Sequence, residues 1–487
     1  MTQKNSAELV PGLAENVHLL GAGGAGLSGA ARLLIARGHT VTGYDRAESP
    51  FTASFAELGI ELTIADSDAS CLPQSAGAVV RSAAIGDDDP QVALALERGL
   101  TVLKYSELLG VIAPEGRTLA VAGTHGKTTA SWMLFHALQG VAEVGERGAP
   151  EPGALIGGLH RRFGRNAVAP GPGGWFSVEA CEYDRSFLQL RPRGAVITNL
   201  EEDHLDYYGT YEELERAFAR FVDQIHPDGL LVVGENVSER VTEAAHCPVW
   251  RMGRELEVDL LAEHQGFFQF RLRGPGWASS PVQLKVPGAF NVENAALALA
   301  LSMGVAAQDV DSAEALAASA RALHRFIGVE RRFEPWGTSG GVEVVHDYAH
   351  HPTEVAATLE AARRTMPGKP IHVLFQPHQH SRTARFLAEF VEALRGADRV
   401  IVADVYGARV HIDREGAGAA DLVQRLVRAG VDAATGGTPS ESVHELCAHI
   451  GGESAALVLG AGDIDGIKDE LLHELALRGS APGRPLR

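Results

Sequence analysis

Short apolar runs that end in polar or glycine-rich residues alternate along the chain with stretches whose apolar residues recur at helical spacing. The first run, Val17–Leu20, enters a glycine turn and a helical pattern, and the second run ends at Asp45. Two further apolar runs, residues 77–85 and 100–108, predict later strands of the same sheet. Because strands alternate with helices, this pattern predicts a parallel sheet flanked by helices.

The same alternation begins again near residue 113. An apolar strand enters a second glycine turn, and strands are predicted at Ala195–Leu200 and at 229–234, with a helix between them. Residues 246–287 alternate irregularly, which predicts antiparallel strands. An alanine-rich helix from Asn291 to about Met303 completes this second unit.

Four apolar runs after Phe326 each end in polar residues and predict a third sheet. They lie at 342–347, 371–376, 399–404 and 456–463. We therefore expect an α/β protein of three domains, at residues 1–112, 113–325 and 326–487. The tail, residues 479–487, is expected to be frayed.

Composition narrows the class of protein. The chain has 487 residues, of which 45% are hydrophobic and 22% charged, as in ordinary soluble proteins. Its formal charge of −19 argues against nucleic-acid partners and anionic membranes, which need a basic face. Basic clusters at 160–165 and 321–332 either serve a phosphorylated ligand or are solvated.

The cysteines and the N-terminus indicate the cellular compartment. Four cysteines lie far apart without a CxxC pair, which argues against a disulfide framework and a structural zinc site. No signal-peptide pattern is visible at the start, and no apolar run is expected to span a membrane. These features predict a reduced, cytoplasmic enzyme, and they leave open whether it is a monomer or a dimer.

The first glycine turn has the spacing of a dinucleotide-binding loop. Gly21, Gly23 and Gly26 form a GxGxxG pattern after a strand, and Asp45 ends the next strand. Glycines allow a pyrophosphate to approach the backbone, and the acid can meet a ribose hydroxyl. NAD and a UDP-sugar both carry a pyrophosphate, so this loop does not distinguish them.

The second glycine turn has the features of a nucleotide-phosphate site. After the strand, Gly123 and Gly126 flank a turn, and Lys127 opens a helix. Backbone N–H groups, the helix N-terminus and the lysine all favour phosphate, and the Thr128 hydroxyl can bind Mg²⁺. The general P-loop pattern would place its first glycine at Val121, and a solvated lysine in a glycine turn is the alternative interpretation.

Acidic side chains follow two strands beyond this loop. Glu179 ends one strand, and His204 lies in the polar loop after another. Mg²⁺ takes hard oxygen ligands, so these strand ends could complete its shell. Glu182, Asp184 and Glu201 are further candidates, and solvated loop acids remain the alternative.

Residues 123–129, Gly-Thr-His-Gly-Lys-Thr-Thr, resemble the ATP site of the Mur ligases, the amide-forming enzymes that build the peptide stem of peptidoglycan. Other segments that resemble family motifs follow in order between residues 18 and 463, among them Asp347-Tyr-Ala-His-His-Pro-Thr-Glu354. The resemblance implies a Rossmann-like UDP-binding domain, a central P-loop-type ATPase sheet and a C-terminal Rossmann-like α/β domain.

The resemblance also implies roles for single residues. The expected UDP-substrate residues are Gly21, Ala22, Gly23, Gly24, Ala25, Gly26, Asp45 and Ser82. The expected ATP residues are Gly123, Thr124, His125, Gly126, Lys127, Thr128, Thr129, Asn291, Asn294 and Arg331, and the expected Mg²⁺ ligands are Thr128, Glu179 and His204. The expected amino-acid-binding residues are Tyr348, His350, His378 and Arg382. Lys127, His204, Arg331, His350, His378 and Arg382 are expected to take part in catalysis, with His350 or His378 as the base.

The chain departs from the family pattern at three positions. Phe290 replaces a histidine, Gln379 stands where arginine is common, and Arg409 stands where glutamate is usual. No lysine occurs between Lys127 and Lys285, which excludes the carbamylated lysine of several relatives and fits the branch that adds the first amino acid.

The implied activity is ATP-dependent joining of L-alanine to the lactyl carboxylate of UDP-N-acetylmuramate, through an acyl phosphate, in peptidoglycan synthesis. A ligase that recycles a whole tripeptide is the nearest alternative; it typically has a cysteine in the first glycine loop, where this chain has Ala22. An NAD-dependent dehydrogenase and a non-catalytic UDP-sugar-binding protein are alternatives of other classes.

Overall fold

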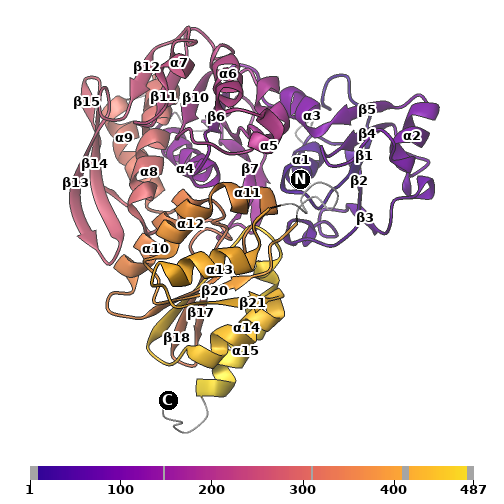
Figure 1. Ribbon diagram of the computed structural model, residues 1–487. Coiled ribbons are helices and arrows are strands. Elements are labelled where there is room, and N and C mark those ends of the chain that lie inside the picture. The colour runs from indigo at the N-terminus through magenta and orange to yellow at the C-terminus, as the bar shows by residue number, and fades with distance from the viewer. Residues whose placement is uncertain (1–8, 146–148, 309–310, 408–415, 480–487) are drawn as a thin grey trace. The chain divides into compact units, whose positions relative to one another are not determined.

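The computed structural model describes residues 9–145, 149–308, 311–407 and 416–479. Contacts within the chain divide it into two compact units (Figure 1). One unit contains Met1–Leu261, Gln269–Gln283 and Asn291–Ile327, and it holds two of the three large sheets. The other contains Ala262–Phe268, Leu284–Phe290 and Gly328–Arg487, and it holds the third large sheet.

The N-terminal sheet has five parallel strands in the order β3-β2-β1-β4-β5, which matches the first five strands of the dinucleotide-binding fold. Its strands are β1 (Asn16–Leu20), β2 (Thr40–Asp45), β3 (Glu61–Ile64), β4 (Ala78–Arg81) and β5 (Thr101–Lys104). Its helices are α1 (Ala25–Ala36), α2 (Pro90–Glu97) and α3 (Tyr105–Ile112), with short 3₁₀ turns η1 (Pro50–Thr52) and η2 (Ala69–Cys71). The predicted parallel sheet is confirmed.

Two predicted strands, residues 77–85 and 100–108, are wrong in their second halves. The first ends at Arg81; the second ends at Lys104, and Tyr105 begins α3. The Glu107 carboxylate accepts a hydrogen bond from the Lys104 N–H at 2.7 Å, which is half of a capping box. This cap stops the strand because it satisfies a backbone donor that would otherwise remain free at the helix start.

The central sheet has seven strands in the order β12-β11-β10-β6-β9-β7-β8, and all neighbouring pairs are parallel except β7 with β8. Its strands are β6 (Thr118–Ala122), β7 (Gly153–His160), β8 (Arg165–Val168), β9 (Phe176–Glu179), β10 (Gly194–Ile197), β11 (Leu230–Val233) and β12 (Val249–Arg251). Its helices are α4 (Lys127–Val144), α5 (Leu205–Tyr208), α6 (Tyr211–Val222), α7 (Glu239–Thr242), α8 (Ala289–Leu301) and α9 (Ser312–Leu323), with η3 (Tyr183–Gln189) and η4 (Ser302–Ala306). The sequence did not predict β7 and β8.

The expected antiparallel strands between residues 246 and 287 are confirmed for the most part. A four-stranded sheet contains β13 (Glu257–His264), β14 (Phe267–Gly274), β15 (Trp277–Ala278) and β16 (Val282–Gln283). The pairs of β14 with β15 and β16 are antiparallel. β12 differs, because it pairs in parallel with β11.

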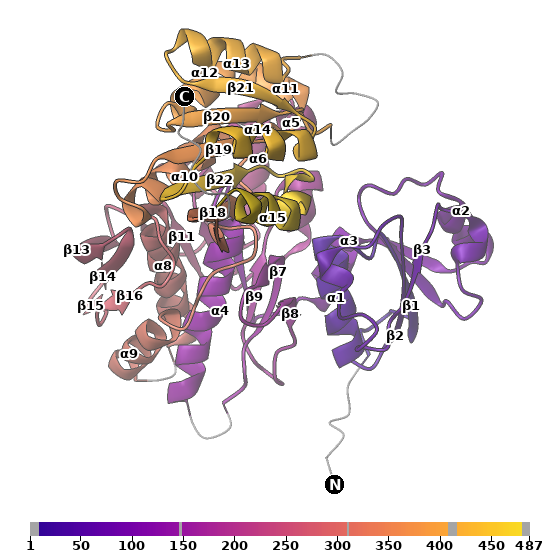
Figure 2. The same cartoon turned by 90° about the horizontal axis from the view of Figure 1, so that it is seen from below.

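Helix α1 joins the N-terminal sheet to the central one (Figure 2). Its Gly29 lies against Leu155 of β7, so closely that a β-carbon would collide with the leucine. The buried Asn166 side chain of β8 donates hydrogen bonds to the Ala25 carbonyl at 2.6 Å and to the Ser28 hydroxyl at 3.1 Å. Small residues on α1 therefore allow the two domains to share one continuous hydrophobic core.

The C-terminal sheet has the order β17-β18-β22-β19-β20-β21 and is parallel except for the edge strand β17. Its strands are β17 (Glu334–Ser339), β18 (Val342–Asp347), β19 (Ile371–Phe375), β20 (Arg399–Ala403), β21 (Ala433–Gly437) and β22 (Ser454–Leu459). Helices α10 (Pro352–Thr365), α12 (Leu387–Leu394) and α13 (Ala419–Arg428) pack on one face. Helices α14 (Pro439–His449) and α15 (Lys468–Gly479) pack on the other, and α11 (His380–Arg385) and η5 (Ile464–Ile467) complete the domain.

All four predicted strands of this domain are confirmed as β18, β19, β20 and β22. The three-domain α/β architecture is confirmed, whereas the exact boundaries at residues 112 and 325 stay predictions. The tail expected to be frayed lies almost entirely outside the described residues.

One apolar run was overlooked by the sequence analysis. Residues Ala289–Ala306 are long and apolar enough to cross a membrane, and 72% of this segment is buried inside the structure. It forms α8 and η4 in the core of the central domain.

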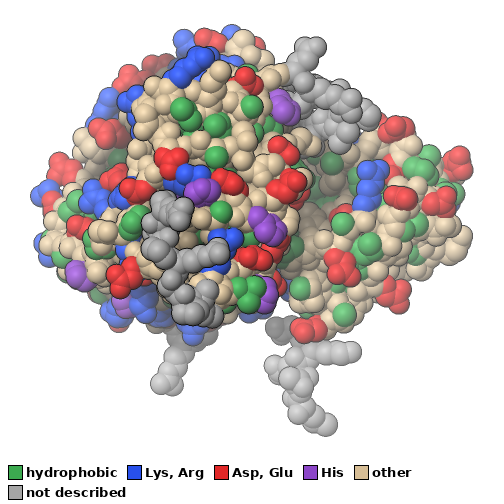
Figure 3. Space-filling model, turned by 60° about the horizontal axis from the view of Figure 1, so that its bottom comes forward, with side chains coloured by type: hydrophobic (Ala, Val, Ile, Leu, Met, Phe, Trp, Pro, Cys, Tyr) green, Lys and Arg blue, Asp and Glu red, His purple; other side chains and the backbone are tan. Residues whose placement is uncertain are grey.

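On the face drawn in Figure 3, acidic and basic side chains are interspersed rather than gathered by sign.

Two histidines meet inside the central domain. His136 of α4 and His160 at the end of β7 lie with their Nε2 atoms 3.0 Å apart, next to the aromatic rings of Trp132, Phe163 and Phe326. Burial lowers the pKa of His136 to about 3, and burial lowers the pKa of His160 to about 4. Both rings are therefore neutral at physiological pH.

This pair predicts acid sensitivity. A histidine in the unfolded chain has a pKa near 6.5. As the pH falls from about 6.5 to about 4, these two histidines therefore bind protons in the unfolded chain but not in the folded one. The free energy of unfolding should drop by up to about 1.4 kcal/mol per pH unit for each histidine. Urea denaturation should show a shallower pH slope for His136→Leu than for the wild type. The exposed His473→Leu should keep the wild-type slope; equal slopes in all three proteins would contradict the prediction.

Candidate functional site

The second glycine turn connects β6 to α4 in a conformation that only glycine tolerates at two positions. Gly123 has φ 129° and lies against Thr198, where a β-carbon would collide. Gly126 has φ 82°, and a β-carbon there would lie 2.5 Å from Asn294 Oδ1. The predicted strand–turn–helix arrangement is confirmed, and its backbone is closely packed against β10 and α8.

Residues that follow β10 hold this turn in place. Asn199 Oδ1 accepts a hydrogen bond from the His125 N–H at 2.8 Å, and the Thr198 hydroxyl donates to the His125 carbonyl at 2.6 Å. The Thr124 hydroxyl accepts from the Glu201 N–H at 2.9 Å. These hydrogen bonds hold the turn in one conformation, as a phosphate-binding loop requires.

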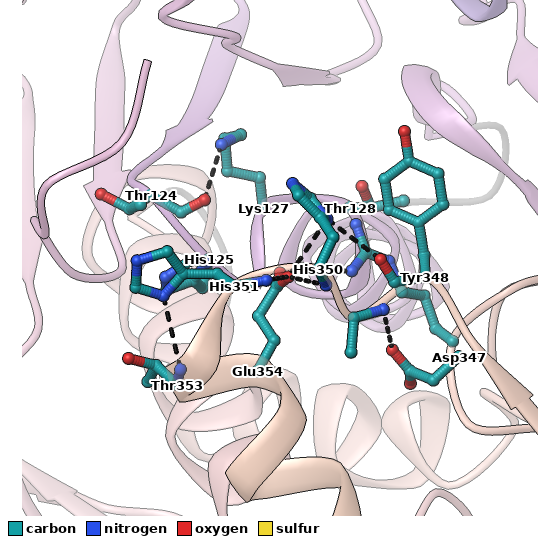
Figure 4. Close-up of polar contacts among 12 residues, drawn as sticks. Thr124, His125, Lys127, Thr128, Asp347, Tyr348, His350, His351, Thr353 and Glu354 are labelled. Carbon is teal, nitrogen blue, oxygen red and sulfur yellow. Dashed lines mark hydrogen bonds and ion pairs between the residues drawn. The ribbon is translucent and has the colours of Figure 1, made fainter. Parts of the chain in front are cut away.

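Lys127 opens α4 with its ammonium group at the centre of the turn (Figure 4). Its Nζ donates to the carbonyls of Gly123 at 2.6 Å and Thr124 at 2.9 Å, and it lies 3.0 Å from the Glu182 carboxylate. Burial lowers the pKa of Lys127, but the negative charges of Glu182, Cys181 and Glu179 and the hydrogen bond to Glu182 together outweigh this effect, and the net pKa is raised. Lys127 therefore stays protonated and can neutralise a phosphate.

Side-chain oxygen atoms that could bind a metal ion lie close to the lysine. The Thr128 hydroxyl donates to Glu179 Oε1 at 3.0 Å, and Glu179 Oε2 accepts from the Gly157 N–H at 2.6 Å. His204 Nε2 lies 3.6 Å from Glu182. A hydroxyl and a carboxylate in contact fit the ligand preference of Mg²⁺.

Other acids near the turn have separate partners. Glu182 contacts both Lys127 and His204, and Glu201 lies 3.5 Å from His125 Nε2. Glu182 therefore connects the lysine and histidine that the sequence singled out. Its position three residues after Glu179 was the only signal for it in the sequence.

Two asparagines at the start of α8 lie under the turn. Asn294 packs against Gly126, and its Nδ2 donates to Asn291 Oδ1 at 3.2 Å. Both side chains are buried. Phe290, one of the departures from the family pattern, is 37% exposed and packs its ring over Gly288.

The first glycine turn is braced by the strand ends around it. The N–H groups of Gly21 and Ala22 donate to the Tyr44 carbonyl, and the Gly23 N–H donates to Asp45 Oδ2 at 2.8 Å. Ser82 lies against Gly21. Asp45 therefore holds the loop itself, in addition to the ribose contact that the sequence predicts.

Tyr105 connects this turn to the phosphate site. A β-carbon on Gly26 would lie 2.6 Å from its ring, so glycine is required for the ring to pack there. Burial raises the pKa of Tyr105, and the charges of Cys181 and Glu179 raise it further. Burial, followed by the charge of Glu182, also raises the pKa of the Cys181 thiol to about 12. The sequence contained no signal for Tyr105.

In the C-terminal domain, Asp347 organises the loop that follows β18. Its buried carboxylate accepts hydrogen bonds from the N–H groups of Phe333 at 2.6 Å and Ala349 at 2.8 Å. Burial raises the pKa of Asp347 to about 6. Sequence analysis had not selected Asp347, although it stands within the motif that was quoted.

Tyr348 follows Asp347, and its ring contacts two arginines. The guanidinium carbons of Arg331 and Arg332 are 4.6 and 5.2 Å from the ring centroid. Arg331 has φ 62° and lies 3.3 Å from Asp465. The backbone therefore departs from common conformations to direct Arg331 toward this ring.

The predicted amino-acid-binding side chains form one cluster. The His350 Nδ1 donates a hydrogen bond to the Tyr348 carbonyl at 3.0 Å, and the Glu354 carboxylate accepts one from the backbone N–H of His350 at 3.1 Å (Figure 4). The ring centroids of His350 and His378 are 5.7 Å apart, and Arg382 lies 3.4 Å from His378. Gln379 has φ 68° and donates its N–H to the Tyr406 carbonyl at 3.0 Å, and Arg409 lies outside the described residues.

Three family models match the chain in the order of its domains. "Mur ligase family, catalytic domain" matches residues 16–117, "Mur ligase middle domain" matches 177–302, and "Mur ligase, glutamate ligase domain" matches 331–462. Together with the glycine turn that encloses Lys127, they define an ATP-dependent ligase of three α/β domains. The chain belongs to the Mur ligase family.

Similar proteins cover the chain almost completely. A curated UDP-N-acetylmuramate–L-alanine ligase of Rubrobacter xylanophilus is 38% identical over 94% of this chain and 100% of its own length. The corresponding ligase of Kineococcus radiotolerans is 40% identical over 95% of this chain and 96% of its own. These identities extend through all three domains.

Solved structures share the fold. The UDP-N-acetylmuramate-alanine ligase of Thermotoga maritima superposes with a TM-score of 0.78 at 24% identity, over 95% of this chain and 99% of that one. A murein peptide ligase of Psychrobacter arcticus superposes with a TM-score of 0.69 at 22% identity, over 95% and 98%.

The contact of Gly26 with Tyr105 predicts an intolerant position. Gly26→Ala should lower the free energy of unfolding by about 1–3 kcal/mol, because the new methyl group forces the ring to move. Gly24→Ala is the matched control, since the nearest atom to its β-carbon is the Gly21 carbonyl oxygen at 3.4 Å. Chemical denaturation should separate the two, and the cost of Gly26→Ala should shrink in a Tyr105→Ala background. Equal costs at both glycines would contradict this account.

Proposed function

We propose that this protein joins L-alanine to the lactyl carboxylate of UDP-N-acetylmuramate, with hydrolysis of ATP to ADP and phosphate. The observation that carries the proposal is the 38–40% identity, along nearly the whole chain, to ligases named for this reaction. The site described above supports it, because it offers a phosphate loop, oxygen ligands and a separate cluster suited to an amino acid.

ATP is assigned to the turn between β6 and α4. We infer that the N–H groups of residues 123–129 and the Lys127 ammonium bind its phosphates, and that Asn291 and Asn294 face the adenine. Thr128, Glu179 and His204 would hold Mg²⁺, which supplies positive charge to the phosphates. The protonated lysine supports this assignment, since burial alone would have tended to neutralise it.

UDP-N-acetylmuramate is assigned to the first glycine turn. Residues 21–26 present backbone to a pyrophosphate, and Asp45 and Ser82 border the turn. The contact between Gly26 and Tyr105 supports a connection from this turn to the phosphate site.

L-alanine is assigned to the cluster of Tyr348, His350, His378 and Arg382. The Arg382 guanidinium suits the carboxylate of the amino acid, and an imidazole suits its ammonium proton. Arg331 would stabilise charge on the transferring phosphoryl group.

The reaction then has two steps. A lactyl carboxylate oxygen attacks the γ-phosphorus of ATP, and the bond from that phosphorus to the bridging oxygen breaks. ADP departs, and the product is an acyl phosphate. His350 or His378 accepts a proton from the alanine ammonium, and the neutral amine attacks the acyl carbon. The bond from that carbon to the phosphate oxygen breaks, and the surplus proton of the amine passes to the leaving phosphate, giving the amide and hydrogen phosphate. Positioning and charge neutralisation do most of this work.

A ligase that attaches a whole tripeptide is the second candidate, because the solved murein peptide ligase shares the fold. Both enzymes would use the same phosphate loop, so the amino compound distinguishes them. Phosphate release with UDP-N-acetylmuramate, ATP and Mg²⁺ should require L-alanine, and the stem tripeptide should not replace it. Release that depends on the tripeptide alone would overturn the proposal.

Removal of the Lys127 charge tests the ATP assignment. Lys127→Ala should lower kcat roughly 100- to 1,000-fold, since a preorganised cation at the phosphates is lost. The exposed Lys285→Ala changes the same charge elsewhere and should keep wild-type kcat. A coupled assay of ADP release measures the rates. Amide formation by Lys127→Ala at the wild-type rate would contradict the assignment of ATP to this turn.

A further inference from the structure

Arg185 lies three residues beyond Glu182, on η3, in a strained backbone conformation. Asp184 and Arg185 both have φ 54°, a left-handed pair within a segment that is otherwise 3₁₀-helical. Two successive non-glycine residues rarely adopt this conformation, and such strain persists where the surroundings impose it, often at ligand-binding sites.

The contacts of Arg185 fix it to Glu182 and to two tyrosines. Its N–H donates to the Glu182 carbonyl at 2.9 Å. Its guanidinium carbon lies 6.0 Å from the Tyr207 ring centroid and 5.7 Å from that of Tyr208. Because the Tyr208 hydroxyl also donates to the Glu182 carbonyl, all these groups are tied to the residue that contacts Lys127 and His204.

The guanidinium has no anionic partner among the side chains that the structure describes. None of their carboxylates lies within ion-pair distance of Arg185, and its buried Nε has no hydrogen-bond partner. Aromatic faces attract the cation but accept none of its hydrogen bonds in the way a carboxylate does. A partly buried arginine in this state is matched to an anion that comes from a ligand.

The next two arginines along the chain already have hydrogen-bond partners within the protein. Arg191 donates to the carbonyls of Leu188 and Leu190, and Arg193 contacts His226. No lysine occurs between Lys127 and Lys285. Arg185 is therefore the cation that this segment offers to a ligand next to Glu182.

The position of η3 indicates which ligand group arrives there. Its end packs against α3 of the N-terminal domain, where Gly110 lies against the Gln189 backbone. The phosphates already have Lys127 and the amides of the turn, whereas the carboxylate that must approach them has no cation assigned to it in this part of the site. A negatively charged nucleophile needs such a cation to come near the γ-phosphate.

We propose that Arg185 binds the lactyl carboxylate of UDP-N-acetylmuramate and orients it toward the γ-phosphate; this inference rests on the proposed function. The fork of N–H groups holds one carboxylate oxygen and leaves the other directed at phosphorus. Tyr207 and Tyr208 restrain the guanidinium and thereby fix the direction of attack. Arg185 is a substrate-binding residue of this chain in addition to those selected from the sequence.

Steady-state kinetics of Arg185→Ala and Arg185→Lys test the proposal. Arg185→Ala should raise KM for UDP-N-acetylmuramate roughly 10- to 100-fold, the loss expected for a charged hydrogen bond, and should leave KM for ATP nearly unchanged. Arg185→Lys should be intermediate, because it keeps the charge and loses the fork. The matched control Arg191→Ala should leave both KM values unchanged. A rise in KM for ATP instead would overturn the proposal.

A binding experiment separates this contact from a structural effect. UDP-N-acetylglucosamine lacks the lactyl group, so its affinity, measured by calorimetry, should be the same for wild type and Arg185→Ala. The affinity for UDP-N-acetylmuramate should fall. Equal losses for both ligands would overturn the inference. Since binding needs no turnover, this result stands apart from the alanine assay: an enzyme inactive with alanine would refute the proposed function, whereas unchanged affinity would refute the role of Arg185.

Discussion

The ion pair of Lys127 and Glu182 is the contact on which the site depends. Burial of a lysine within a glycine turn lowers its pKa, and the Glu182 carboxylate acts against this loss, which matters because a neutral amine cannot neutralise a phosphate. Glu182 keeps the charge in place, and through its other contacts it also positions His204, Tyr208 and the backbone of Arg185. The Glu182 carboxylate thus contacts Lys127 and His204, while the Glu182 backbone carbonyl accepts hydrogen bonds from Tyr208 and Arg185.

The N-terminal domain takes part in this arrangement through packing rather than charge. Gly29 and Asn166 fix α1 against the central sheet, while Gly26 makes room for Tyr105 at the edge of the phosphate site. The first glycine turn and the turn that encloses Lys127 lie on domains that share one hydrophobic core. A shared core of this kind suits the proposed reaction, in which one substrate must reach the other in line.

Sequence analysis found the candidate ligand-binding residues more completely than the residues that hold them in position. Glycine turns, Lys127, Glu179 and the Tyr348–His350 motif are local signals, since each depends on residue types at short spacing, and the structure places each at a strand end. Their roles as ligand-binding residues stay predictions. β7 and β8, which contain many small residues, gave a weak pattern, and the edge strand β17 includes Pro335 and Gly337. Tyr105 and Asp347 act through contacts with segments distant in the sequence, which no local pattern encodes.

Cys181 illustrates how this environment controls reactivity. It stands between Glu179 and Glu182, yet its thiol has a pKa of about 12 because it is buried among negative charges. Alkylating agents and peroxides attack the thiolate, which is scarce at such a pKa. A cysteine beside Glu179 and Glu182 is therefore expected to react slowly with alkylating agents and peroxides.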